Sequence, residues 1–158
     1  GGYYFADLLD VLSSTTNNNN FTSMPELRIR FTSPHPKDYP TELLQLMAER
    51  PNICNSLHMP IQSGSNAMLQ VMKRGYTQEA YLQLIHDVWD IVGNGNAQNV
   101  GISSDFISGF CNETYEDHLE TVKVMEYVKY DHAFMFAYSL REQTYASKKL
   151  SDNVSPEN

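Results

Sequence analysis

Apolar residues recur along this chain with two different spacings, and the alternation of the two predicts helices and strands in turn. Helical spacing marks five segments: Phe5–Leu12, Leu43–Met47, Met68–Met72, Tyr81–Val92 and Leu119–Met125. Period-two alternation or a short apolar run marks four strands: Leu27–Phe31, Ser56–Met59, Val100–Ile107 and Ala133–Tyr138. The order α–β–α–β–α–α–β–α–β is typical of an α/β protein built from parallel βαβ units.

Polar residues at the helix starts agree with these boundaries. Ser65 and Thr77 precede two of the helices as N-cap residues, and Gly75 ends the first of them. Thr114 and Asp117 resemble a capping box in which Asp takes the usual place of Glu. We therefore expect well-defined starts for the last three long helices.

The pattern also predicts which segments are buried and which are flexible. The run Ala133–Tyr138 (AFMFAY) is continuously apolar, which is typical of a strand buried on both faces. The helix after Thr114 is expected to bury Leu119, Val122 and Met125. Residues 13–24, rich in Ser, Thr and Asn, are predicted to form a flexible loop, and residues 147–158 a frayed tail.

Four loops follow the four predicted strands. In a parallel α/β protein, ligands bind at the C-terminal ends of the strands, whether the strands form an open sheet or half of a barrel. The loops in question are Thr32–Pro36, Pro60–Ser65, Ser108–Asn112 and Ser139–Thr144. We therefore expect any small-molecule site to lie among these loops.

Polar side chains in these loops offer binding groups, although each also has a structural alternative. Gln62 presents a donor and an acceptor together, Asp105 can accept hydrogen bonds from a ribose or an amine, and Arg141 can hold a carboxylate or a phosphate. The alternatives are helix caps, a proline-braced turn at His35, and solvated side chains. His58, within a strand, is more often a hydrogen-bonded core residue than a ligand. Spacing alone indicates a small-molecule site and no catalytic triad, phosphate loop or metal cage.

Composition narrows the class of protein further. The chain has 158 residues, 41% hydrophobic and 19% charged, which suits one ordinary domain. A net charge of −8 disfavours a general nucleic-acid binder, and no apolar run approaches the roughly 20 residues that span a bilayer. Two cysteines, Cys54 and Cys111, exclude a disulfide scaffold, a four-cysteine zinc site and a self-contained iron–sulfur cluster. The start lacks Met and a basic region, so it reads as the middle of a longer chain rather than as a signal peptide.

Four motifs in a fixed order carry a resemblance to a known family. They are LRIRFTSPHP (Leu27–Pro36), LHMPIQSGSNAMLQVMKRGYT (Leu57–Thr77), SSDFISGFCNET (Ser103–Thr114) and FMFAYSLREQTYA (Phe134–Ala146). Together they resemble the MiaB-like radical S-adenosylmethionine methylthiotransferases that modify tRNA. The segments SPHPKDYP and GFCNET are similar to the eukaryotic branch of this family. That branch is named for association with the regulatory subunit of a cyclin-dependent kinase.

The resemblance implies a fold, a reaction and a set of site residues. The fold is a partial, radical-SAM-type barrel of parallel strands, which uses S-adenosylmethionine and two [4Fe–4S] clusters to methylthiolate N6-isopentenyladenosine in tRNA. Carried over, the cofactor-binding positions are Ser33, Gln62, Ser63, Asp105, Ile107 and Gly109. The substrate-side positions are His35, Tyr138 and Arg141.

The chain also departs from the family pattern, and the departures bear on its activity. The CxxxCxxC half of the barrel, the N-terminal cluster domain and the RNA-binding TRAM domain have no counterpart here, and no residue is assigned to a metal. Asn112 stands where the family has Gly and is strained if its φ is positive. Residues 1–158 are therefore expected to be one partial radical SAM domain, inactive by itself.

Two functional hypotheses remain from the sequence. The first is a piece of a tRNA methylthiotransferase, whose partner is tRNA and whose RNA affinity lies largely in other domains. The alternative is a non-catalytic interaction protein that regulates a cyclin-dependent kinase through its activator subunit. The resemblance places either protein inside the cell, in mitochondria or cytosol, and associates neither with a membrane.

Overall fold

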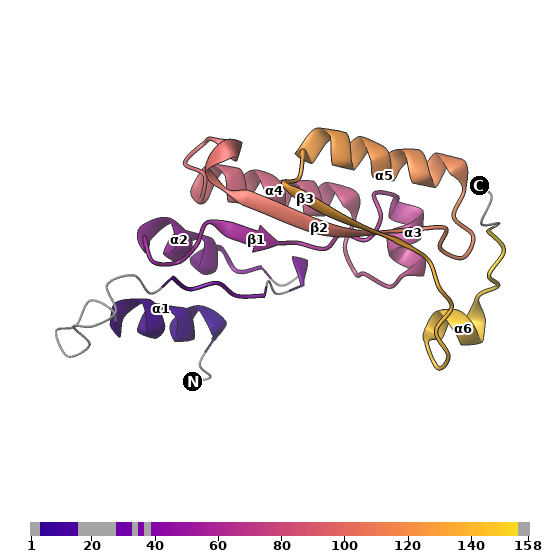
Figure 1. The fold of residues 1–158 in the computed structure, drawn as a ribbon, viewed down its shortest axis with the longest axis horizontal. Helices are drawn as coiled ribbons and strands as arrows, with labels where there is room; N and C mark the ends of the chain where they lie inside the picture. The colour runs from indigo at the N-terminus through magenta and orange to yellow at the C-terminus, as the bar shows by residue number, and fades with distance from the viewer. Residues whose placement is uncertain (1–3, 16–27, 33–34, 37–38, 155–158) are drawn as a thin grey trace.

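A parallel β-sheet lies at the centre of the molecule (Figure 1). The computed structural model of the chain describes residues 4–15, 28–32, 35–36 and 39–154. Three adjacent strands form the sheet in chain order: β1 (Ser56–His58), β2 (Gly101–Ser108) and β3 (His132–Ala137). Leu57 pairs with Ile102 and Phe106 pairs with Met135 in parallel ladders. The predicted α/β class with parallel strands is confirmed.

Helices alternate with the strands, as the spacing predicted. They are α1 (Phe5–Thr15), α2 (Thr41–Glu49), α3 (Asn66–Val71), α4 (Gln78–Ile91), α5 (Tyr115–Val128) and α6 (Tyr145–Lys149), with a 3-10 turn, η2 (Ala97–Asn99), before β2. Ser65 and Thr77 cap α3 and α4 with their side chains, and Thr114 and Asp117 form the predicted capping box of α5. In Figure 1, α4 and α5 lie along the sheet, whereas α3 and α6 lie at the C-terminal ends of the strands.

One face of the sheet carries the apolar core. Along β2, Ile102, Ser104 and Phe106 are buried, and the two apolar residues belong to one cluster with side chains of α2, α4 and α5. The alternate residues Ser103 and Asp105 lie on the opposite face and are only half-buried. The sheet therefore has a helix-covered face and a second, more open face that carries polar side chains.

Strand β3 is more exposed than its sequence predicts. Phe134, Met135 and Phe136 are 50%, 63% and 54% exposed, so the prediction that Ala133–Tyr138 is buried on both faces is wrong for the described chain. The physical reason is position, because among the described residues β3 is the last strand of the sheet and has a neighbour, β2, on one side only.

Helix α5 presents a different side to the core from the one predicted. Thr121, Val124 and Val128 are buried, whereas Leu119 is exposed and Val122 and Met125 are partly buried. The helix turns this side inward because Thr121 Oγ1 accepts a 2.9 Å hydrogen bond from the Gly64 amide and lies 3.2 Å from Ser63 Oγ. Polar contacts, which an apolar count does not register, set the rotation of the helix.

Two predictions near the N-terminus need correction. Helix α1 continues to Thr15, so Ser13 and Ser14 are helical rather than part of the predicted loop, and Ser13 is buried with its hydroxyl bonded to the Asp10 carbonyl. Residues 16–24 of that loop lie outside the described residues. Among the described residues, the predicted strand Leu27–Phe31 is reduced to one parallel bridge between Ile29 and Ile53, because only Ile29 exchanges backbone hydrogen bonds there, with Asn52 and Cys54; Leu27 is outside the described residues.

The segment expected to fray is partly ordered. Ser147–Lys149 belong to α6, whose N-cap is Thr144, and Leu150 packs against Met68, Phe110 and Cys111. The Asn153 side chain exchanges two hydrogen bonds with Asn112, of 2.8 and 3.0 Å. Asn112 has φ 65°, so the positive φ considered for this position is present. Residues 155–158 of the tail lie outside the described residues.

Candidate functional site

A pocket of about 590 Å³ opens at the C-terminal ends of β2 and β3, beside α3 and α6. Its size falls within the range of small-molecule sites. Gln62, Asp105 and Ile107 line it from β2 and the loop after β1, and Tyr138 and Arg141 line it from the segment after β3. Three of the four loops that the sequence assigned to ligand binding therefore contribute to one pocket, whereas none of the described residues of the first loop, Thr32–Pro36, lines it.

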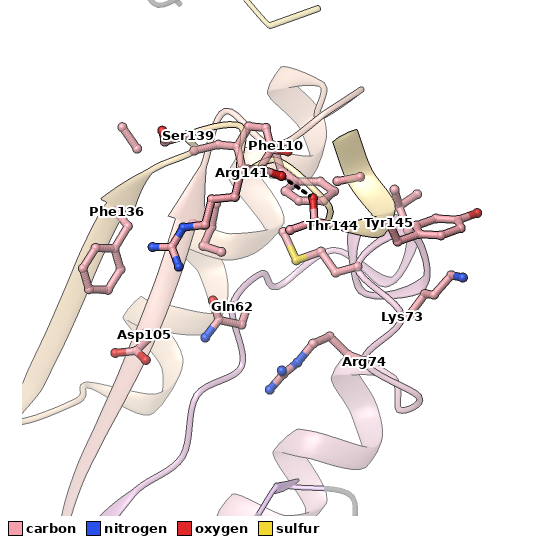
Figure 2. Close-up of a pocket in the computed structure, with 16 residues that line it drawn as sticks. Gln62, Lys73, Arg74, Asp105, Phe110, Phe136, Ser139, Arg141, Thr144 and Tyr145 are labelled. Atoms are coloured by element: carbon pink, nitrogen blue, oxygen red, sulfur yellow. Dashed lines mark hydrogen bonds between the residues drawn. The ribbon is translucent and has the colours of Figure 1, made fainter. Parts of the chain in front are cut away.

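Three polar side chains converge in this pocket (Figure 2). Figure 2 shows the guanidinium of Arg141 directed toward Gln62 and Asp105. Gln62 is held by its backbone, since its N–H donates to the Asp105 carbonyl at 3.0 Å and its carbonyl accepts from Ile107 at 2.9 Å. Within the described part of the chain, the Arg141 guanidinium makes no hydrogen bond or ion pair, so it is available to an anionic group.

Two further cations border the pocket, and sequence reasoning missed their role. Lys73 and Arg74 line it from the end of α3, where the sequence suggested only favourable charges at a helix end. Lys73 Nζ lies 3.3 Å from the ring centre of Tyr145, and Arg74 donates to the Pro60 carbonyl at 2.8 Å. A chain of net charge −8 thus gathers positive charge at this pocket, which favours a ligand with an anionic part.

Aromatic rings form the apolar wall of the same pocket. The rings of Phe110 and Tyr138 pack edge to face at 4.7 Å, and Phe136 lies nearby on β3. The Tyr138 hydroxyl is buried without a hydrogen-bond partner among the described residues. Burial and the nearby Cys111 thiol raise the pKa of Tyr138. The phenol of Tyr138 and the thiol of Cys111 thus lie together at the apolar wall of the pocket.

Asp105 is also held from the open face of the sheet. His58 Nε2 lies 3.4 Å from Asp105 Oδ2, and His58 Nδ1 lies 3.0 Å from Ser103 Oγ. The Phe134 ring packs edge-on against the imidazole, with centroids 6.2 Å apart. The sequence indicated a hydrogen-bonded histidine here, and the structure adds that its bonding partners lead to the pocket.

The nine predicted site residues separate into three groups. Gln62, Asp105, Ile107, Tyr138 and Arg141 line the pocket. The other described positions do not line it: Ser63 is fully buried against Thr121, the Gly109 amide is bonded to Glu113, and the His35 ring packs on Tyr76 at 5.3 Å. Ser33 lies outside the described residues.

The described residues do not fit an iron–sulfur cluster. Cys54 and Cys111 are both free thiols, and no three His, Cys, Asp or Glu side chains in the described ranges gather as metal ligands do. A [4Fe–4S] cluster needs more thiolates than this chain possesses. None of the helices between residues 4 and 154, as far as they are described, is long and apolar enough to cross a membrane.

Several curated proteins match the chain over almost all of its length. It is 54% identical over 153 residues to the "CDK5RAP1-like protein" of Oryza sativa, covering 97% of this chain and 23% of that protein. It is 49% identical over 157 residues to the human "Mitochondrial tRNA methylthiotransferase CDK5RAP1", covering 99% and 24%. It is 45% identical over 156 residues to the "tRNA-2-methylthio-N(6)-dimethylallyladenosine synthase" of Prosthecochloris aestuarii, covering 99% and 32%. No family model matches the chain.

The fold has a counterpart among solved structures. Coproporphyrinogen III oxidase (HemN) from Escherichia coli, a radical SAM enzyme, superposes with a TM-score of 0.62 over 78% of this chain and 27% of that chain. At 21% identity the likeness concerns the fold alone, and it supports the predicted partial radical-SAM-type barrel. The chain spans about a quarter to a third of the length of the curated relatives it matches. These findings confirm the resemblance, and the chain is homologous along nearly all its length to one segment of the tRNA methylthiotransferases.

Proposed function

We propose that this chain supplies the S-adenosylmethionine-binding side of a radical SAM tRNA methylthiotransferase. The observation that carries the proposal is the pocket in which Gln62, Asp105 and Arg141 converge at the strand ends. S-adenosylmethionine combines a flat adenine, two ribose hydroxyls, an ammonium group and a carboxylate. The pocket offers a partner for each of these parts.

The polar side chains of the pocket are chemically complementary to the polar groups of S-adenosylmethionine. Asp105 accepts hydrogen bonds from ribose hydroxyls or from an ammonium group, and Gln62 both donates and accepts. Arg141 pairs with a carboxylate through two parallel hydrogen bonds. The rings of Phe110, Phe136 and Tyr138 give adenine an apolar wall. S-adenosylmethionine, once reduced by a cluster, supplies the radical chemistry, and these residues bind and orient it.

Binding of S-adenosylhomocysteine, a stable analogue, to the purified chain tests this proposal by isothermal titration calorimetry. We expect binding in the micromolar to millimolar range, and Arg141→Ala to weaken it about tenfold, because a charge-assisted contact is lost. Arg28→Ala is the matched control, since Arg28 is exposed and does not line the pocket. A folded chain that binds no analogue, or an Arg28→Ala variant as impaired as Arg141→Ala, contradicts the proposal.

We further propose that the chain by itself does not catalyse the reaction. Cleavage of S-adenosylmethionine needs a reduced cluster, and two cysteines cannot ligate one. Anaerobic reconstitution with iron and sulfide measures this directly. We expect no stoichiometric [4Fe–4S] absorbance and no 5′-deoxyadenosine; the appearance of both contradicts the proposal.

The identity of the full reaction rests on the relatives. Because their names specify tRNA and N6-dimethylallyladenosine, we propose methylthiolation of that nucleoside in tRNA as the activity of the whole protein, and a mitochondrial location after the mammalian relatives. Mass spectrometry of mitochondrial tRNA from cells that lack the protein measures the loss of the modified nucleoside. The kinase-regulator hypothesis receives no support from the matched activities.

A further inference from the structure

Three polar side chains on the open face of the sheet form a chain that ends at the pocket. Ser103 Oγ lies 3.0 Å from His58 Nδ1, and His58 Nε2 lies 3.4 Å from Asp105 Oδ2. Asp105 lines the pocket, whereas His58 and Ser103 do not. His58 therefore approaches the candidate ligand-binding carboxylate without itself lining the pocket.

The neighbours of His58 select one arrangement of its ring proton. The carboxylate of Asp105 favours an N–H at Nε2, because an unprotonated Nε2 would set its lone pair against a negative oxygen. Nδ1 is then an acceptor, and the Ser103 hydroxyl is the donor in reach at 3.0 Å; the same hydroxyl lies 3.5 Å from the Leu57 carbonyl. The Phe134 ring closes one side of the imidazole and limits its rotation.

We infer that His58 is a positioning residue, which holds the Asp105 carboxylate in the orientation that the pocket needs. The inference rests on the proposed function, since it assigns Asp105 a ligand to receive. Ser103 sets the tautomer of His58, and the His58 Nε2–H, 3.4 Å from Asp105 Oδ2, favours the orientation in which the Asp105 carboxylate lines the pocket. Pre-orientation of this kind improves affinity because the side chain loses less freedom on binding.

The ring proton of His58 is the first test and needs no ligand. Nitrogen NMR of the ¹⁵N-labelled chain at about pH 8, where ordinary imidazoles are neutral, distinguishes the two tautomers. We expect the Nε2–H form at His58 and a mixture of forms in the Asp105→Asn variant. His132 is the internal comparison. Its ring stacks on that of Phe134, with ring centroids 6.4 Å apart. An Nδ1–H tautomer at His58 in the unaltered chain overturns the inference.

Two substitutions at His58 then separate positioning from packing. In His58→Gln the amide nitrogen takes the place of Nε2 and keeps a donor toward Asp105. In His58→Asn the amide takes the place of Nδ1 and keeps only the contact with Ser103. We expect binding of S-adenosylhomocysteine within about threefold of the unaltered chain for Gln and about tenfold weaker for Asn. His86→Asn on α4 is the control, because His86 contacts Tyr127 and not the pocket.

The two proposals fail in different ways. Equal loss of affinity in His58→Gln and His58→Asn, with both variants folded, overturns the positioning role and leaves S-adenosylmethionine binding intact. Absence of binding in the unaltered chain overturns the proposed ligand, while the tautomer measurement still decides whether His58 is held by Asp105. Binding that is kept in His58→Gln but weakened in His58→Asn, together with the Nε2–H tautomer of His58, supports the inference.

Discussion

Strands β2 and β3 are paired along six residues, yet they lie in different surroundings. The half of the molecule built on β1, β2, α2, α4 and α5, here the closed half, gathers its buried apolar side chains in one core. The half built on β3 and α6, here the open half, leaves its apolar side chains exposed and holds much of the pocket. The difference teaches that the apolar core lies in the closed half, whereas the pocket takes polar side chains from both halves, Gln62 and Asp105 from the closed one and Arg141 from the open one.

The largest expected effect compares one residue type in the two halves. Phe106→Ala in β2 removes a ring that is 2% exposed and is expected to lower the free energy of unfolding by about 3–5 kcal/mol. Phe134→Ala in β3 removes a half-exposed ring and is expected to cost less than about 1 kcal/mol. Urea unfolding followed by circular dichroism measures both. Equal losses would show that the open half is as well packed as the closed one.

A second comparison concerns the contact of α5 with the loop before α3. A methyl group on Gly64 would lie 2.5 Å from the Glu120 carbonyl oxygen and 2.7 Å from Thr121 Cα, so Gly64→Ala is expected to cost about 1–3 kcal/mol. Gly101→Ala is the control, because its nearest neighbour would be 3.7 Å away. Thermal unfolding of both variants measures the difference; a Gly64→Ala variant as stable as Gly101→Ala would mean that α5 moves freely on the sheet.

The buried tyrosine pair makes the closed half sensitive to alkali. Tyr81 donates to the Met59 carbonyl at 2.9 Å and lies 2.9 Å from the Tyr130 hydroxyl, and burial raises the pKa of both phenols above 10.0. A raised folded-state pKa contributes stability that is fully present below pH 10.0 and is lost as the pH rises above it. Tyr81→Phe is expected to cost about 1–2 kcal/mol at neutral pH.

The pH dependence of unfolding checks the tyrosine prediction. We expect the urea midpoint of the unaltered chain to fall as the pH rises from about 10 to about 12, and to fall less in the double variant Tyr81→Phe, Tyr130→Phe. The other tyrosines remain in both proteins and act as the internal control. Parallel pH profiles would place the two hydroxyls in contact with water instead.

The smallest expected effect compares two helix caps. Thr114→Ala removes the capping box of α5, where Thr114 Oγ1 accepts from the Asp117 amide at 3.2 Å, and is expected to cost about 1 kcal/mol. Thr144→Ala removes the similar cap of the short helix α6 in the open half and is expected to cost a few tenths of a kcal/mol. Differential scanning calorimetry resolves the two; a larger loss for Thr144 would reverse the comparison of the halves.

Features governed by local chemistry were predictable from the sequence. The caps at Ser65, Thr77 and Thr114 and the parallel order of the strands follow from residue type and spacing. The exposure of β3 was not predictable, because apolar runs report what a strand can bury and not whether a neighbour lies beside it.

In the candidate site, too, some residues were predictable from the sequence and others were not. Gln62, Asp105 and Arg141 were found because polar residues after parallel strands meet at one edge. Lys73 and Arg74 were missed because they follow a helix, α3, whereas the prediction rested only on polar residues that follow strands. Ser63 was assigned to the pocket but is buried against Thr121, a partner on α5 that is distant in the sequence and that residue type and spacing do not reveal.

Gln62 has a consequence for any attempt to improve this protein. Its φ is 76°, a left-handed conformation that glycine adopts freely and that costs another residue about 1–2 kcal/mol. Selection for thermal stability alone would therefore favour Gly at this position, and the change would remove the amide from the pocket. Residue 62 is thus a point at which optimising the fold and preserving its chemistry demand opposite substitutions.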